Sequence, residues 1–174
     1  ADAKKDAKAD AAKMKEEMFL SGKVKTHDLV KVSVIDSPAP QALRATVERI
    51  YSARKGIDPR CLGQEIEFTR SPGHWGDVSL SIGEQALVFV ASIGGRLYED
   101  PWHGHMVVDE IDGRQYASFP CRELWLRADV PASLRAYSKQ DPKRSYATAI
   151  RLDAIETYLV ELIANEQSWS GENE

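Results

Sequence analysis

Apolar and polar residues alternate in short runs between positions 28 and 118, which is the pattern of β-strands half buried in a sheet. The first run, 28–37, places its three valines on one face, and we expect that face to point inward. Pro38 and Pro40 should end this strand, because proline has no amide hydrogen to donate to a ladder.

More runs of the same kind follow along the chain. Further strands are expected at 42–52, 61–70, 86–91, 96–100 and 104–119. The run Ala86–Ala91 is apolar throughout, which indicates a central strand covered on both faces. The pairs Gly94-Gly95 and Asp112-Gly113 favour hairpin turns. The middle of the chain therefore predicts five or six short strands.

The two ends of the chain follow a different pattern. Residues 146–168 carry apolar side chains at three- and four-residue spacing, which predicts an amphipathic helix packed on the strands. Residues 1–20 open with strong helix formers but no apolar stripe, and we expect a polar helical or disordered extension. Residues 169–174 have the composition of a disordered tail. These boundaries leave one domain over 21–168.

Composition narrows the class of protein. The chain has 174 residues, 43% of them hydrophobic, which is enough for one domain with its own core. A net charge of −4 counts against a protein that mainly neutralises phosphates. No apolar run is long enough to span a bilayer, so we expect a soluble chain, and the compartment stays open. Cys61 and Cys121 fit either one disulfide or two thiols.

The stretch Glu99–Met106, EDPWHGHM, raises the question of a metal site. His103, His105 and Glu110 have the His-x-His-x4-Glu spacing of the first metal motif of cupins, and on a strand the two histidines would share a face. Two imidazoles and a carboxylate would leave open positions on a divalent ion. No further histidine follows His105, however, so the second cupin motif is missing. A solvated, glycine-hinged loop is the simpler interpretation.

Other catalytic signals are absent from the sequence. It contains no Gly-x-Ser-x-Gly elbow and no Gly-x-Gly-x-x-Gly phosphate loop. The adjacent carboxylates Glu99 and Asp100, like Asp109 and Glu110, should point to opposite faces of a strand and act as solvating charges.

The order of the strand motifs resembles a known family of modules. The matching residues are Val47, Ile50, Tyr51, Gly63, Ile66, Phe68, Gly83, Leu87, Val88 and Phe89. Their pattern, over about residues 28–118, is similar to the OB-type barrel of netrin-like and tissue-inhibitor-of-metalloproteinase-like modules. The resemblance implies a mainly β, α+β fold with a five- to six-stranded OB-like barrel, and a bias toward protein binding. That family's amino-terminal metal-chelating cysteine and framework disulfides are absent, so metalloproteinase inhibition does not carry over.

Two loops would then carry the binding chemistry, because loops project side chains from a rigid scaffold. The predicted protein-binding residues are His74 and Trp75 in the loop 71–77, and Tyr98, Glu99, Asp100, Trp102 and His103 in the loop 98–105. Tyrosine and tryptophan dominate interface hot spots.

The sequence thus predicts a non-catalytic module without a cofactor that binds another protein. It could be a bacterial inhibitor or immunity protein whose acidic loops complement a basic cleft. Two alternatives remain open: a cupin-like metal-dependent enzyme using His103, His105 and Glu110, and an OB fold that binds single-stranded nucleic acid by stacking bases on aromatic side chains.

Overall fold

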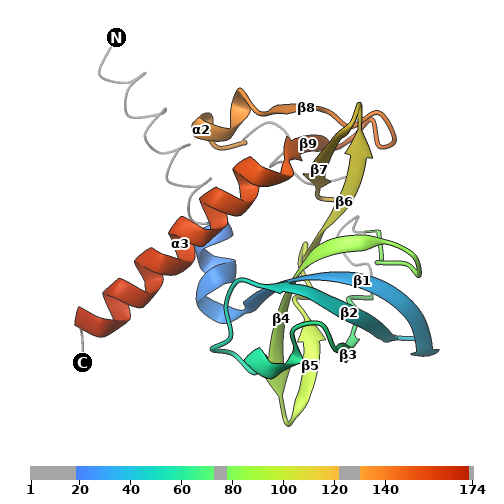
Figure 1. The fold of residues 1–174 in the computed structure, drawn as a ribbon, viewed down its shortest axis with the longest axis vertical. Coiled ribbons are helices and arrows are strands. Elements are labelled where there is room, and N and C mark those ends of the chain that lie inside the picture. The colour runs from blue at the N-terminus through green and yellow to red at the C-terminus, as the bar shows by residue number, and fades with distance from the viewer. Residues whose placement is uncertain (1–18, 73–77, 122–129, 173–174) are drawn as a thin grey trace.

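The structure is a computed structural model that describes residues 19–72, 78–121 and 130–172, with side chains of the last helix described as far as Glu166 (Figure 1). The strands are β1 (Asp28–Ala39), β2 (Ala42–Ile50), β3 (Glu65–Thr69), β4 (Gln85–Ile93), β5 (Arg96–Glu99), β6 (His105–Ile111), β7 (Arg114–Ser118), β8 (Ser138–Gln140) and β9 (Thr148–Arg151). The helical elements are a short helix over residues 19–26 that precedes β1, the 3₁₀-helix η1 (Pro59–Cys61), α2 (Ala132–Arg135) and α3 (Leu152–Glu172).

The first five strands close into a barrel. Strand β1 pairs with both β2 and β4, β3 pairs with β2, and β5 joins β3 to β4. The β3–β5 contact is parallel and all the others are antiparallel. The mainly β, OB-like barrel with a C-terminal helix is therefore confirmed. Beyond β4 the same sheet continues through β6, β7, β9 and β8.

Strand β4 separates two hydrophobic cores, as its continuous apolar run predicts. Ala86, Val88 and Val90 point into the barrel. Leu87 and Phe89 point the other way, into a second core shared with the helix over 19–26 and with α3. A strand with a core on each face needs apolar residues at every position, which is why alternation disappears here.

The C-terminal helix starts later and ends later than predicted. It begins at Leu152, because Thr148–Arg151 forms β9. Ile150 and Arg151 of β9 pair with Ala117 and Tyr116 of β7, so tertiary pairing decides the conformation of a segment whose spacing also fits a helix. The helix continues to Glu172, so residues 169–172 are helical rather than a disordered tail.

Two further boundaries differ from the prediction. Leu20 is 1% exposed and Val24 2% exposed within the second core, so the folded unit begins before residue 21. Residues 1–18 lie outside the described residues. Strand β1 continues through Pro38 to Ala39, and its pairing with β2 is irregular there, which accommodates a residue that cannot donate to the ladder. Among the helices of the described residues, none is both long and apolar enough to cross a membrane.

Helix α3 is joined to the barrel by a polar contact as well as by its apolar stripe. Tyr51 donates a hydrogen bond to Glu156 Oε2, and Arg49 Nη1 lies 2.7 Å from the same oxygen. Burial and the bond to Glu156 raise the pKa of the Tyr51 hydroxyl. The end of β2 is thereby tied to the first turns of α3.

We expect Tyr51→Phe to lower the free energy of unfolding by about 1–2 kcal/mol, because a hydrogen bond to a charged group is lost without a change in shape. Urea denaturation followed by circular dichroism measures the change. Tyr137→Phe is the matched control, since Tyr137 is 44% exposed. Equal losses in the two variants would contradict a specific role for the contact with Glu156.

Candidate functional site

The β5–β6 loop, residues 100–104, carries most of the predicted site and is fixed by its own backbone. Asp100 N donates to Phe89 O at 2.9 Å, and Phe89 N donates to Gly104 O at 2.8 Å, so both ends of the loop are bonded to β4. Trp102 N donates to Asp100 Oδ1 at 3.0 Å, which forms a side-chain-closed turn. The loop is therefore rigidly placed before any partner arrives.

A buried lysine ties this loop to the helix over 19–26. Lys23 is only 5% exposed, and its Nζ donates to Asp100 Oδ2 at 2.8 Å and also to the carbonyl oxygen of Trp102. The same Nζ lies 5.2 Å from the ring centroid of Phe19 and 5.4 Å from that of Phe89. Removal from water strengthens this ion pair and makes the loss of either member costly.

The neighbouring carboxylate, Glu99, forms a second buried pair. His105 Nδ1 lies 3.0 Å from Glu99 Oε2, and the two side chains are 4% and 1% exposed. Both residues point into the barrel, because Glu99 pairs with Val90 and His105 with Val88. Glu99 Oε1 and His105 Nε2 have no hydrogen-bond partner among the described residues. The prediction that Glu99 and Asp100 are solvating charges is wrong, since both make internal pairs.

Gly104 is required by this arrangement. A Cβ at this position would lie 2.2 Å from the carbonyl oxygen of Asp100 and 2.7 Å from Glu99 Oε2. Real Cβ atoms do not approach other atoms this closely. The glycine in the His-Gly-His sequence therefore serves close packing of the loop against the Glu99 side chain.

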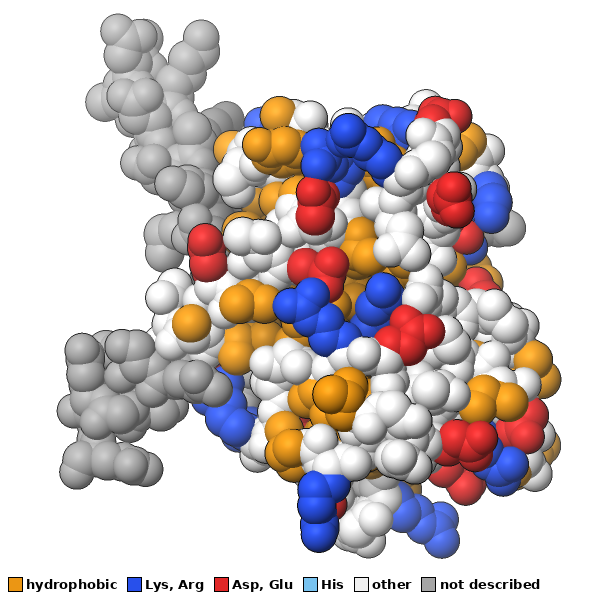
Figure 2. Space-filling model, viewed as in Figure 1, with side chains coloured by type: hydrophobic (Ala, Val, Ile, Leu, Met, Phe, Trp, Pro, Cys, Tyr) orange, Lys and Arg blue, Asp and Glu red, His pale blue; other side chains and the backbone are white. Residues whose placement is uncertain are grey.

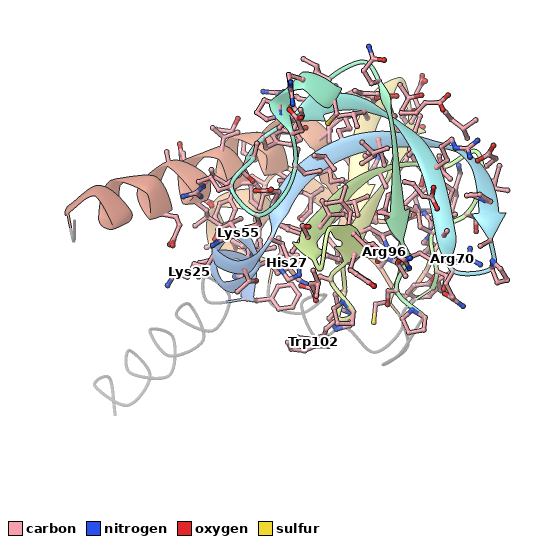
Figure 3. The ribbon with its side chains drawn as sticks, turned by 90° about the horizontal axis from the view of Figure 1, so that it is seen from below. Lys25, His27, Lys55, Arg70, Arg96 and Trp102 are labelled. Carbon is pink, nitrogen blue, oxygen red and sulfur yellow. The ribbon has the colours of Figure 1, made fainter. Side chains whose placement is uncertain are left out.

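Trp102 is the large aromatic side chain that this loop presents to solvent. It is 42% exposed, whereas Glu99 and His103 are buried and Tyr98 is half-buried. Its ring packs edge-on against Phe19, with centroids 5.7 Å apart, and lies 5.0 Å from the ring of His103. Figure 3 shows Trp102 at the lower edge of the molecule. The other predicted binding residues, His74 and Trp75, lie outside the described residues.

The structure does not assemble the three residues of the metal-site alternative. His103 sits in a turn with a φ of 51° rather than on a strand, so it does not share a strand face with His105. Glu110 is exposed on β6 five residues beyond His105, and odd spacing places the two on opposite faces. Within the described ranges, no group of three or more His, Cys, Asp or Glu residues could hold a metal ion.

The two cysteines lie in separate surroundings, and no disulfide joins them. Cys121 is buried in the second core, and Cys61 packs against the barrel core. Burial raises the pKa of the Cys61 thiol, which disfavours the reactive thiolate.

The outer face of β2 and β3 lacks the features of a single-strand binding surface. Its exposed residues include Glu48, Glu65 and Glu67, and none of the outward residues of these strands is aromatic. Figure 2 shows acidic and basic side chains interspersed over the face formed by β1 and β2. Binding of single-stranded nucleic acid needs exposed aromatic side chains on which bases stack and a continuous basic groove for the backbone.

Sequence reasoning missed Phe19, Lys23 and His27 as parts of the site. The apolar spacing of Phe19, Leu20 and Val24 could have indicated the helix, but no local signal pairs Lys23 with a residue 77 positions away. His27 is half-buried beside the ion pair, with its Nδ1 3.8 Å from Asp100 Oδ2.

His27 makes the stability of this region depend on pH. Burial lowers the pKa of His27 below its ordinary 6.5, although Asp100 opposes the shift. Since the unfolded chain then binds more protons than the folded one, the stabilisation is complete above about pH 6.5 and is lost as the pH falls below it. We expect urea denaturation to show a smaller loss between pH 7.5 and pH 5 in His27→Asn, by at most about 1.4 kcal/mol per pH unit. Identical pH slopes in the two proteins would contradict this role.

Comparisons of the chain with known protein families, with characterised proteins and with solved structures each found no match. The likeness to netrin-like modules stays a prediction from the sequence pattern.

Proposed function

We propose that this chain is a non-catalytic protein-binding module that docks a partner through Trp102. The observation that carries the proposal is a large aromatic side chain, 42% exposed, on a loop held by buried ionic and backbone contacts. Tryptophan is among the residues most enriched at interface hot spots.

The rigidity of the loop supports this role. Ordering a mobile side chain at an interface costs about 0.5–1.5 kcal/mol. Here Lys23 holds the Trp102 carbonyl and Phe19 supports one side of the indole, so much of that cost is already met in the free protein. Little of the energy gained by burying the exposed part of the indole would then be lost to ordering the loop, so most of it would contribute to affinity.

We expect Trp102→Ala to reduce partner capture at least about tenfold, since truncating a hot-spot side chain typically costs 2 kcal/mol or more. The immobilised full chain and its variants are incubated with extract of the native host, and bound proteins are quantified by mass spectrometry. Captured proteins are then made recombinantly and their Kd values measured directly.

Tyr137→Ala is the matched control, because Tyr137 is similarly exposed at 44% but lies beyond α2, before β8. Retention of every captured protein by Trp102→Ala, or equal losses from the two variants, would refute the proposal. The identity of a Trp102-dependent partner also decides whether the module acts as an inhibitor or immunity protein.

A further inference from the structure

We propose that the partner docks an acidic surface onto Trp102 and a row of lysine and arginine side chains beside it. This inference rests on the proposed function and reverses the expectation that acidic loops of this chain contact a basic cleft. The basic row is defined as Lys25, Arg54 and Lys55.

The acids of the loop are not available to a partner. Asp100 is paired with Lys23, and its side chain is 13% exposed. Glu99 is 4% exposed and bonded to His105 inside the barrel. Charge complementarity at the surface therefore cannot come from these two carboxylates.

The exposed charges next to the loop are basic. Lys25 follows Lys23 by two residues on the same short helix and is exposed. Arg54 and Lys55 are exposed on the segment after β2. No ion pair joins Lys25, Arg54 or Lys55 to a carboxylate within the described part of the chain.

A buried aspartate places this segment beside the helix. Asp28 is 1% exposed, and its carboxylate accepts hydrogen bonds from the backbone amides of Arg54, Lys55 and Ile57 at 2.7, 2.8 and 3.1 Å. Asp28 directly follows His27, whose ring approaches Asp100. The basic row and the β5–β6 loop are thus connected by fixed contacts, and Figure 3 shows Lys55, Lys25 and His27 together on the same side.

An exposed acid in the same segment, Asp58, already has a cationic partner. Asp58 pairs with Arg60 at 2.8 Å. Three cations that have no carboxylate partner among the described residues are tied to the loop that carries Trp102. Together they fit an acidic peptide or protein surface that also offers an apolar side chain to the indole. Opposite charges would steer association and fix the orientation of the partner. The outer face of β2 and β3 mixes glutamate with arginine side chains and carries no aromatic residue, so it adds no stacking platform for nucleic acid.

The test selects ligands without assuming their charge. Short random peptides displayed on phage are selected on the immobilised full chain, and binders that also bind Trp102→Ala are removed. We expect the remaining peptides to be enriched in Asp and Glu, and Lys25→Glu and Lys55→Glu to weaken their binding about tenfold at physiological salt. High salt should weaken binding to the unaltered chain as well.

Arg114→Glu is the control for net charge. Arg114 is exposed at the start of β7, across the turn from the far end of β6, so the same charge change is placed away from the loop. Trp102-dependent peptides that are neutral or basic, or equal effects of Lys55→Glu and Arg114→Glu, would overturn the inference and leave the proposed function intact.

Two other results would also decide the matter. Failure to enrich any Trp102-dependent peptide would count against the proposed function and the inference together. A fluorescently labelled random single-stranded DNA, followed by anisotropy, provides the remaining arm. Binding of this DNA that is lost in both Trp102→Ala and Lys55→Glu would assign the basic row to nucleic acid and overturn an acidic protein partner.

Discussion

Asp100→Ala is expected to lower the free energy of unfolding by about 3 kcal/mol, because it leaves the buried ammonium of Lys23 without its carboxylate. The variant also removes the acceptor that closes the turn at Trp102 N. Urea denaturation gives the stability change, and amide hydrogen exchange at residues 102–104 reports the release of the loop. Partner capture should fall together with loop protection.

A surface ion pair supplies the control for this effect. Lys139 Nζ lies 3.2 Å from Asp112 Oδ2, with side chains 37% and 89% exposed. Asp112→Ala would disturb a left-handed turn residue, so Lys139→Ala is the cleaner change. We expect it to cost less than about 1 kcal/mol, as exposed pairs do.

The double variant Lys23→Met/Asp100→Asn tests the origin of the cost. It removes both charges at once, and replacing a buried pair by neutral groups of similar size is far less costly than breaking it. The double variant should therefore be more stable than Asp100→Ala. If its loss equals or exceeds that of Asp100→Ala, the uncompensated charge is not the cause.

The barrel could be predicted because its strands obey a local rule. Period-two alternation located β1, β2 and β3, and the unbroken apolar run located β4 between two cores. The strand β9 escaped because its four residues gain their conformation from pairing with β7. The residue pattern within one segment does not show whether another strand will offer an edge for it to pair with.

The site was harder to predict than the fold for a similar reason. An acidic pair before a tryptophan reads as solvated when only its neighbours in sequence are considered. Its actual environment is set by Lys23, far away along the chain, and by His105 across the loop. Trp102 was named as a candidate from its residue type and its place in a loop, and its side chain is 42% exposed.

Gly104→Ala is expected to cost about 3 kcal/mol and to abolish binding through Trp102, because overpacking a closed site forces backbone shifts. The added methyl group would collide with the Asp100 carbonyl oxygen and with the Cγ of Glu99, at 2.2 and 2.6 Å. The backbone cannot yield on the Asp100 side without moving the carboxylate that Lys23 holds. Denaturation and partner capture measure the two effects.

Gly22→Ala separates this collision from the general effect of replacing a glycine. Gly22 lies in the short helix over 19–26, and a Cβ there meets nothing within 4 Å. Alanine should therefore stabilise that helix by up to about 1 kcal/mol. If Gly104→Ala instead kept full stability and full capture, the β5–β6 loop would be able to rearrange around an added side chain. That result would contradict the rigid placement of Trp102, on which the binding proposal depends.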